Sequence, residues 1–438
     1  MNIDTKLRNA ITASVLGRYS VYAVQFLSMV IMARYFTPTE FGIFAIVQVF
    51  SIFFSLLGEM GLVPALVNQE RINEKMRDSV FTLTLVFGLV LCSILYFCSP
   101  IISNIYNNDI YKIIIPPVSI SIIFTTLSIV PLASLQKERR FLSIAYSESL
   151  SEIVSLSVVL FLFNKIDSIL LLSMKPLIVA ISKFIFLYLS SKKTKTGLSG
   201  FLFDFKEVRK IISFSGYQSG FNFINYFSRN LDNLLVGKFF SASDLGIYDK
   251  AYQIMRYPLM LLTFAISPAI QPVLTIIKND IEEFERLHNK LIRYLSIIGV
   301  FIGGLIYIFS DDIVYIILGE QWSEVSGLLS ILALSIPIQV VLSSSGGFYQ
   351  ASGRVDLLFQ CGIFSGCINC IAIIVGVSSG SLEQLCYLLF VSYIINFFQC
   401  YFVFCKHVLK GRYLGFLKGL LPAAMIYTFF IMAILKLD

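Results

Sequence analysis

The sequence is poor in charged residues and in the residue types that carry most enzyme chemistry. Only 14% of its 438 residues are charged, and it contains two histidines and one tryptophan. A soluble globular protein has about 25% charged residues. The sequence also lacks a GxxxxGK[ST] motif, with which many proteins hold nucleotide phosphates. These absences argue against a soluble enzyme and against a chain that hydrolyses nucleotide itself.

Apolar residues dominate instead. They make up 57% of the chain, and the mean hydropathy is +0.80. They recur in runs of about 20 residues, the length of helix that crosses ~30 Å of hydrocarbon. The first run is too long for a cleaved signal peptide, so we expect it to be retained. We predict an all-α polytopic membrane protein with thirteen transmembrane spans, at residues 13–33, 41–67, 79–103, 113–136, 142–163, 168–190, 211–236, 246–277, 291–309, 325–350, 357–378, 382–404 and 414–436.

The lysines and arginines predict the orientation of these spans. If the N-terminus is cytoplasmic, most of the 34 basic residues fall in cytoplasmic loops, and the loops on the other side hold few. Cytoplasmic loops of membrane proteins are enriched in lysine and arginine in this way. We therefore expect a multi-pass protein of the bacterial inner membrane with its N-terminus in the cytoplasm. The net charge of +7 then requires no nucleic-acid partner.

The chain resembles two related halves of six spans each. Residues Ala33–Phe44 match Gly237–Tyr248 position by position: small, basic, two aromatic, hydroxyl, small, hydroxyl, acidic, apolar, Gly, Ile and aromatic. Both segments would join the first and second spans of a half. Parallel repeats of this kind build transporters with a central cavity between two lobes. We predict an N-terminal lobe at 1–190, a basic cytoplasmic linker at 191–210, a C-terminal lobe at 211–405 and an extra C-terminal helix at 406–438.

Several basic residues fall inside predicted spans. A charge in the bilayer costs at least about 2.5–3.5 kcal/mol, so such a residue usually faces a cavity or a partner. Arg256 is too deep for its side chain to reach water. Arg18 could instead reach the cytoplasmic surface, and Lys250 could lie on a solvated rim. The candidate cations for an anionic substrate are Arg18, Lys175, Arg229, Lys250 and Arg256.

Embedded acidic residues are candidates for coupling transport to an ion. They are Glu59, Glu148, Glu152 and Asp232. Glu148 and Glu152 are four residues apart and share a helix face. The alternatives are ion pairs, of Glu148 or Glu152 with a lysine such as Lys175, and of Asp232 with Arg229.

The sequence offers no pattern for a metal or a cofactor. Cys367 and Cys370 have CxxC spacing, but they lie inside a predicted span with no second pair, so we interpret them as core thiols. His288 and His407 fall in predicted cytoplasmic loops without catalytic neighbours. The first and seventh spans are rich in hydroxyl and amide side chains, which would suit a cavity that accepts sugar.

Several segments resemble the polysaccharide-transport (Wzx-type) flippases. Ala33–Gly42 is similar to their first external loop, and Asp232–Phe239 with Leu245–Gln253 is similar to their seventh and eighth spans. Gln136–Phe141 and Gly319–Trp322 add weaker similarity. The resemblance implies the multidrug/oligosaccharidyl-lipid/polysaccharide exporter fold, with Arg18 and Arg256 in the positions of cavity arginines.

The same resemblance implies a non-enzymatic flippase. Its substrate would be an undecaprenyl-pyrophosphate-linked repeat unit, such as that of O-antigen in lipopolysaccharide biosynthesis, and a polymerase and a chain-length regulator would be partners. Alternatives are a drug cation antiporter of the same superfamily, a peptidoglycan-precursor flippase and a membrane scaffold. Embedded bases outnumber embedded acids, which favours an anionic substrate. The glycan, the coupling ion and the oligomeric state stay open.

Overall fold

The computed structural model describes residues 3–70, 72–209, 226, 229–263, 274, 277 and 280–434, with side chains from residue 15 to residue 428. These residues are helical nearly throughout and contain no strand, as the sequence predicts. The chain divides into two compact units, Met1–Gly246 and Ile247–Asp438. The predicted division at the linker 191–210 stays a prediction.

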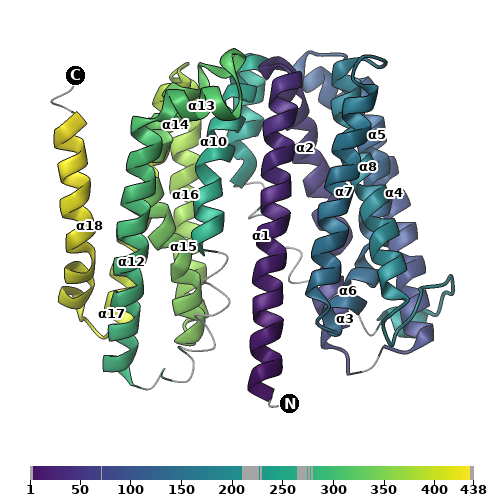
Figure 1. Ribbon diagram of the computed structural model, residues 1–438, viewed down its shortest axis with the longest axis horizontal. Helices are drawn as coiled ribbons and strands as arrows, with labels where there is room; N and C mark the ends of the chain where they lie inside the picture. Colours follow the sequence, from purple (N-terminus) through teal and green to yellow (C-terminus); the bar gives the residue numbers. More distant parts are fainter. Residues whose placement is uncertain are drawn as a thin grey trace. The chain divides into compact units, whose positions relative to one another are not determined.

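Unit 1 is a bundle of long helices joined by short turns (Figure 1). Within it, α1 packs on α7, α7 on α8, α8 on α5, and α5 on both α4 and α2. The first six predicted spans each correspond to one of these helices or to a broken pair. The helices are α1 (Ile3–Tyr35), α2 (Pro38–Glu59), α3 (Leu62–Asn68), α4 (Glu74–Tyr106), α5 (Tyr111–Leu127), α6 (Ile129–Lys137), α7 (Phe141–Leu162) and α8 (Ser168–Ser191).

Two of the predicted spans are broken helices. The span 41–67 is α2 followed by α3, because Met60 and Gly61 take left-handed backbone angles, with φ of 41° and 67°. The span 113–136 is α5 followed by α6, with Ser128 at the break. The short helices α3 and α6 pack on each other. The first break leaves Glu59 as the last residue of α2.

The two matching loop segments fold into the same local structure. In the first, Glu40 N–H donates to Thr37 Oγ1 at 3.3 Å, and Thr37 N–H donates to Glu40 Oε2 at 2.7 Å. In the second, Asp244 N–H donates to Ser241 Oγ at 3.1 Å, and Ser241 N–H donates to Asp244 Oδ2 at 3.1 Å. Each is a reciprocal capping box that satisfies free N–H groups at a helix start. The boxes begin α2 and α10 (Ala242–Thr263), so the repeat in the sequence is also a repeat in structure.

The first turns of α2 and α10 cross at two glycines. A Cβ atom on Gly42 would lie 1.7 Å from the carbonyl oxygen of Ala242, and one on Gly246 would lie 2.0 Å from the carbonyl oxygen of Pro38. Pro38 and Ala242 hold the same position in the two matching segments, as do Gly42 and Gly246. The contact is therefore backbone against backbone, and any side chain at either glycine would prevent it.

Unit 2 contains the rest of α10 and the helices that follow it. Here α12 packs on α15 and α18, and α17 packs on α14, α15 and α16. The predicted span 325–350 is a pair of helices bent by 57°. Asn369 Oδ1 accepts hydrogen bonds from Ser392 and Asn396, both at 2.9 Å, and so ties α16 to α17. The elements are α12 (Ile281–Ile308), α13 (Ser310–Ile317), the 3-10 turn η1 (Glu320–Trp322), α14 (Val325–Ala333), α15 (Ile336–Ala351), α16 (Val355–Ser378), α17 (Leu382–His407) and α18 (Tyr413–Ile434).

The interpretation of His288 as a loop residue is wrong. Asp280 caps α12 by accepting from the N–H groups of Glu282 and Glu283, so the helix begins ten residues before the predicted span. His288 is fully buried on this added length, with its ring 4.8 Å from that of Phe404. Its Nδ1 meets Asn289 Oδ1 at 3.0 Å, whereas its Nε2 is buried without a hydrogen-bond partner.

We expect His288→Phe to be at least as stable as the parent protein. The substitution keeps the ring packing and removes a buried polar nitrogen without a partner, which costs about 1–3 kcal/mol. The midpoint of thermal unfolding in detergent measures this, with His288→Ala as the control that leaves a cavity. A midpoint for His288→Phe as low as that of His288→Ala would show that the imidazole itself is needed.

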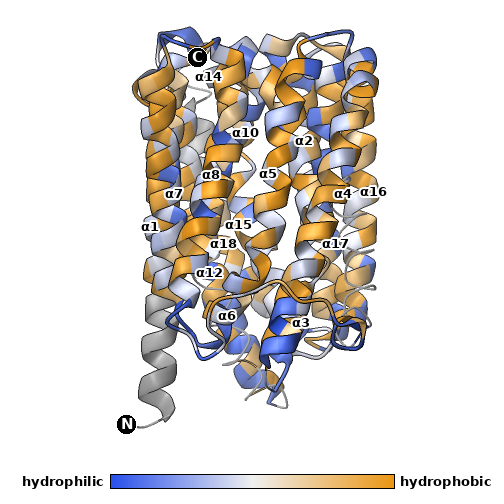
Figure 2. Ribbon diagram, turned by 90° about the vertical axis from the view of Figure 1, so that its right-hand side faces the viewer, coloured by the Kyte–Doolittle hydropathy of each residue, from blue (hydrophilic) through white to orange (hydrophobic). Residues whose placement is uncertain are grey.

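Long apolar helices make this a multi-pass membrane protein. Within the described residues, nine helices are long and apolar enough to cross a membrane, or ten if the bent pair is one span. Figure 2 shows hydrophobic residues along these helices and more hydrophilic residues near their ends. The count of thirteen is not confirmed, because the predicted spans 211–236, 246–277 and 414–436 lie partly outside the described residues. The helix α10 carries four charges, Asp244, Asp249, Lys250 and Arg256.

Candidate functional site

Two ion pairs join α7 to α8 in unit 1. Lys175 Nζ lies 2.7 Å from Glu152 Oε1, and Lys183 Nζ lies 2.7 Å from Glu148 Oε1. The two acids share a face of α7, as their spacing predicts. The structure thus forms the pair of an acid with Lys175 that we considered as the alternative to ion coupling. It forms a second pair of the same kind with Lys183.

The Glu152–Lys175 pair is the more buried of the two. The side chain of Glu152 is 11% exposed and that of Lys175 21%, against about a third for both partners in the second pair. Lys175 Nζ also donates to the buried hydroxyl of Ser28 at 3.1 Å, and Ser155 Oγ donates to the Lys175 carbonyl at 3.3 Å. The lysine therefore connects α1, α7 and α8, and its charge is compensated inside the protein.

Glu59 stands apart from these pairs. Its side chain is exposed at the end of α2 and makes no hydrogen bond within the described residues. Its carboxylate is close enough to Lys183 to interact with that charge electrostatically. Lys183 thus interacts with two acids, Glu148 directly and Glu59 at longer range.

Both candidate arginines of unit 1 lack an acidic partner among the described residues. Arg18 on α1 and Arg229, in the helical segment 229–239, both have exposed side chains. Asp232 is three residues from Arg229 but is buried, 5% exposed, and the two do not form an ion pair.

In unit 2, Lys250 and Arg256 lie on α10 in opposite surroundings. Lys250 is buried, 4% exposed, with its Nζ 3.0 Å from Gln253 Oε1 and 3.7 Å from Asp249 Oδ2. The alternative interpretation, in which Lys250 lies on a solvated rim, is therefore wrong. Arg256 is exposed, its guanidinium lies 5.9 Å from the centre of the Tyr252 ring, and no acid within the described residues pairs with it.

The cysteines and histidines of the described residues do not gather into a metal site. Cys367 is exposed on α16 and Cys370 is half-buried, so the interpretation of both as core thiols is wrong for Cys367. Most of the polar positions predicted in the seventh span lie outside the described residues. Tyr226 is an exception, and its hydroxyl donates to the Val49 carbonyl at 2.7 Å.

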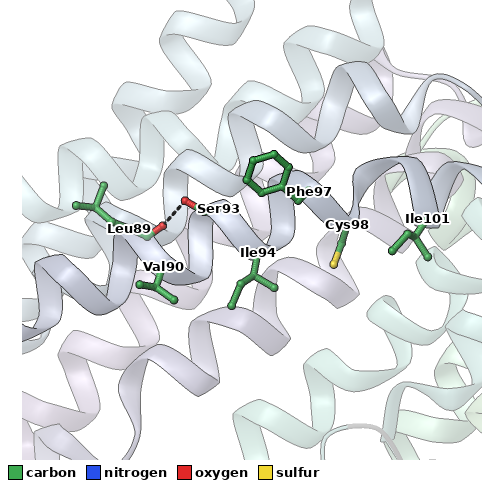
Figure 3. A pocket seen from close by; sticks show the side chains of 7 residues that line it. All are labelled: Leu89, Val90, Ser93, Ile94, Phe97, Cys98 and Ile101. Carbon is green, nitrogen blue, oxygen red and sulfur yellow. Dashed lines mark hydrogen bonds between the residues drawn. The ribbon is translucent and has the colours of Figure 1, made fainter.

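Sequence reasoning missed an apolar surface depression on α4. Figure 3 shows that all its lining residues come from this one helix. Ser93 Oγ donates to the Leu89 carbonyl at 2.8 Å, so the depression offers no free polar group. Its chemistry suits an acyl chain rather than a sugar. The lining residues are Leu89, Val90, Ser93, Ile94, Phe97, Cys98 and Ile101.

Comparison with known families places the chain among proteins of glycan assembly. A family described as polysaccharide biosynthesis protein matches residues 31–327, which is more than half of the chain. The chain belongs to the polysaccharide biosynthesis protein family. It is 22% identical to the lipopolysaccharide biosynthesis protein WzxC of Escherichia coli strain K12, over 96% of this chain and 85% of that protein. It is 23% identical to the teichuronic acid biosynthesis protein TuaB of Bacillus subtilis strain 168, over 85% of this chain and 77% of that protein.

Solved structures of transporters share the fold of this family member. The inward closed lipid II flippase MurJ aligns with a TM-score of 0.74 at 18% identity, over 97% of this chain and 98% of that chain. An inward-facing multidrug resistance MATE transporter of the MOP superfamily aligns with a TM-score of 0.66 at 13% identity, over 93% and 95%. The protein therefore has the two-lobe transporter fold that the sequence resemblance implies.

Proposed function

We propose that this protein is a flippase for an undecaprenyl-pyrophosphate-linked oligosaccharide repeat unit. It moves the unit from the cytoplasmic to the periplasmic leaflet of the bacterial inner membrane by alternating access, with its N-terminus in the cytoplasm. The names of its relatives support a surface polysaccharide such as O-antigen as the product. A polymerase that consumes the flipped unit, with its chain-length regulator, is then the expected partner.

The proposal rests on which candidate residues have a partner of opposite charge and which do not. Glu148 and Glu152 are both paired with lysines. Arg18, Arg229 and Arg256 are exposed and have no acidic partner among the described residues. The candidate residues without an opposite charge beside them are therefore mainly basic, with Arg18 and Arg229 in unit 1 and Arg256 in unit 2, which suits an anion.

A pyrophosphate is the kind of anion that arginine recognises best. The guanidinium offers two parallel N–H donors that match two phosphate oxygens. Away from bulk water, the attraction between opposite charges is several times stronger than in solution. Arginines without partners would thus hold the headgroup while the polyprenyl chain stays in the lipid.

Glu59 is the best candidate for coupling to an ion. It is the exposed acid next to the break between α2 and α3, and Lys183 interacts with both it and Glu148. If a proton or cation neutralised Glu59, Lys183 would interact electrostatically with Glu148 only. Glu148, Glu152 and Asp232 are weaker candidates, since the first two are ion-paired and Asp232 is buried.

Substitution of the exposed arginines tests the proposal. In a strain that lacks the protein, we expect lipid-linked repeat units to accumulate on the inner leaflet and wild type to clear them. Arg256→Ala and Arg18→Ala should clear them about ten to a hundred times more slowly, because each loses a charged hydrogen bond of about 1.5–3 kcal/mol. Arg286→Ala is the matched control, since that exposed arginine is paired with Glu283 at 2.6 Å.

The alternatives predict other phenotypes. A strain that accumulates no lipid-linked unit but becomes sensitive to cationic drugs would identify a drug cation antiporter. Loss of peptidoglycan synthesis would identify a peptidoglycan-precursor flippase. Full clearance by both arginine variants at normal membrane levels would exclude the arginines from the substrate site.

A further inference from the structure

The segment that follows α8 is bound to unit 1 rather than free. This segment, residues 192–209, is called the linker strap here. Its backbone N–H groups at Gly200, Leu202 and Asp204 donate to Asp78 Oδ1 at 2.7 Å, Thr82 Oγ1 at 3.1 Å and Ser79 Oγ at 2.9 Å. The three acceptors lie on the first turns of α4. Alternate residues from 200 to 204, which form neither helix nor strand, are thereby fastened to one membrane helix.

Further contacts fasten the first part of the linker strap. Arg77 is a buried residue, 9% exposed, and its guanidinium donates to the Thr196 carbonyl. The Arg140 side chain donates to the Lys193 carbonyl, and the Lys195 N–H donates to the Glu138 carboxylate. Tyr188 on α8 donates to the Ser199 carbonyl at 2.8 Å. The strap is therefore held by α4, by α8 and by the turn between α6 and α7.

The fastened strap presents apolar side chains outward. Phe201, Phe203 and Phe205 are 72%, 58% and 65% exposed, and Leu202 is 45% exposed. Of these, Phe201 touches the protein core through the Phe81 ring at 5.4 Å. Contiguous apolar side chains on a water-facing surface are uncommon and mark a contact with another phase or molecule.

This apolar surface continues the lipid-facing side of α4. Thr82, which binds the strap, is followed on the same helix face by Val86, Leu89 and Val90 at helical spacing. These three residues are 51%, 47% and 47% exposed, and Leu89 and Val90 line the depression in Figure 3. The exposed apolar face of α4 is thus continuous with the strap.

Basic residues accompany the exposed apolar ones. All five that lie in the strap have exposed side chains, and the positive-inside pattern predicts that they face the cytoplasmic leaflet. Anionic headgroups attract such clusters next to a membrane span. The five are Lys192, Lys193, Lys195, Lys206 and Arg209.

We propose that the linker strap is an interfacial lipid-binding element, in which Phe201, Phe203 and Phe205 insert among the lipids while its basic residues contact anionic phospholipid headgroups. Segments with aromatic and leucine side chains on one side and lysine and arginine on the other bind membrane surfaces in this way. The strap would hold the chain between the two predicted lobes at a fixed depth. This role is independent of the substrate that the protein carries.

Tryptophan fluorescence in reconstituted vesicles tests the proposal. The variant is Phe203→Trp, measured as the difference from the parent, whose one tryptophan, Trp322, is buried. Val90→Trp is the control on the exposed apolar face of α4, and Asp109→Trp, at a side chain that is 86% exposed outside the strap, is the water-facing control. We expect brominated phospholipid to quench the tryptophan fluorescence of Phe203→Trp as strongly as it quenches that of Val90→Trp. We also expect the emission of Phe203→Trp to shift to shorter wavelength when phosphatidylglycerol replaces part of the phosphatidylcholine.

A further variant tests the proposed contact between the basic residues of the strap and anionic headgroups. Adding Lys206→Gln and Arg209→Gln to Phe203→Trp should remove the phosphatidylglycerol-dependent shift and leave the quenching by brominated lipid. Quenching of Phe203→Trp by aqueous acrylamide to the extent seen for Asp109→Trp would overturn the proposal, because the strap would face water. Protection from both quenchers would also overturn it, because protein rather than lipid would cover the strap.

Discussion

Gly42→Ala is expected to destabilise the protein strongly. The new Cβ would lie 1.7 Å from the Ala242 carbonyl oxygen, where a backbone atom stands and no side chain can turn aside. Overpacking of this kind costs typically about 1–3 kcal/mol and occasionally more. We expect the upper end of that range, seen as a lower midpoint of thermal unfolding in detergent and a smaller yield of monodisperse protein.

A glycine in open space is the matched control. A methyl group added to Gly362 on α16 would have no other atom within 4 Å, so Gly362→Ala should be neutral or should stabilise by about 0.5–1 kcal/mol. Gly246→Ala should behave like Gly42→Ala, because it meets the Pro38 carbonyl oxygen from the other helix. Equal midpoints for Gly42→Ala and Gly362→Ala would show that the two helix starts do not cross as described.

Lys175→Ala should have the second large effect. It leaves the carboxylate of Glu152, an 8% exposed residue, without its cation, and an uncompensated buried charge costs about 3–5 kcal/mol. The thermal midpoint should therefore fall sharply. Lys183→Ala should lower it less, because both members of that pair are about a third exposed.

A double variant separates the structural role of Lys175 from a role in transport. Replacing a buried ion pair by apolar residues of similar size is often neutral, so Glu152→Leu with Lys175→Met should recover stability. If Lys175 only holds α1, α7 and α8 together, the double variant should also clear the lipid-linked unit. A stable double variant that fails to do so would assign Lys175 to the transport reaction. A double variant as unstable as Lys175→Ala would contradict the account of the ion pair.

The long helices could be predicted well from the sequence because their signal is local. A run of about 20 apolar residues is sufficient to indicate a span, and α1, α4, α7 and α8 lie close to the predicted ranges. The resemblance between Ala33–Phe44 and Gly237–Tyr248 also had a local cause, since hydroxyl and acid three residues apart form a capping box in each copy.

Features that depend on distant parts of the chain could not be predicted in the same way. The break at Met60 and Gly61 interrupts an unbroken apolar run, so hydropathy gives no sign of it. His288 was misplaced because the polar first turns of α12 resemble a loop until the aromatic rings around them are known. The contacts of the linker strap join residues more than a hundred positions apart, such as Asp78 and Gly200.

The candidate site shows the same limit. Residue type and depth were enough to select Lys175 and Arg256, but not to tell a compensated cation from an uncompensated one. That distinction rests on Glu152, which lies 2.7 Å from Lys175, whereas Arg256 has an aromatic ring beside it. The pair of Arg229 with Asp232, one of the two alternatives for these residues, has suitable spacing but is not formed between them, because helical spacing permits a contact without requiring it.

Movement of a lipid-linked sugar across a membrane is the most direct test of the proposed function. The purified protein would be reconstituted into sealed vesicles with an undecaprenyl-pyrophosphate-linked oligosaccharide in both leaflets, and a sugar-modifying enzyme that cannot cross the membrane would be added outside. Wild type should make the sugar of both leaflets accessible, Arg256→Ala should do so much more slowly, and protein-free vesicles should expose the outer leaflet alone. If the inner-leaflet sugar stays protected with wild type while a cationic dye crosses the same vesicles, the protein is a cation transporter and the anion-binding account is wrong.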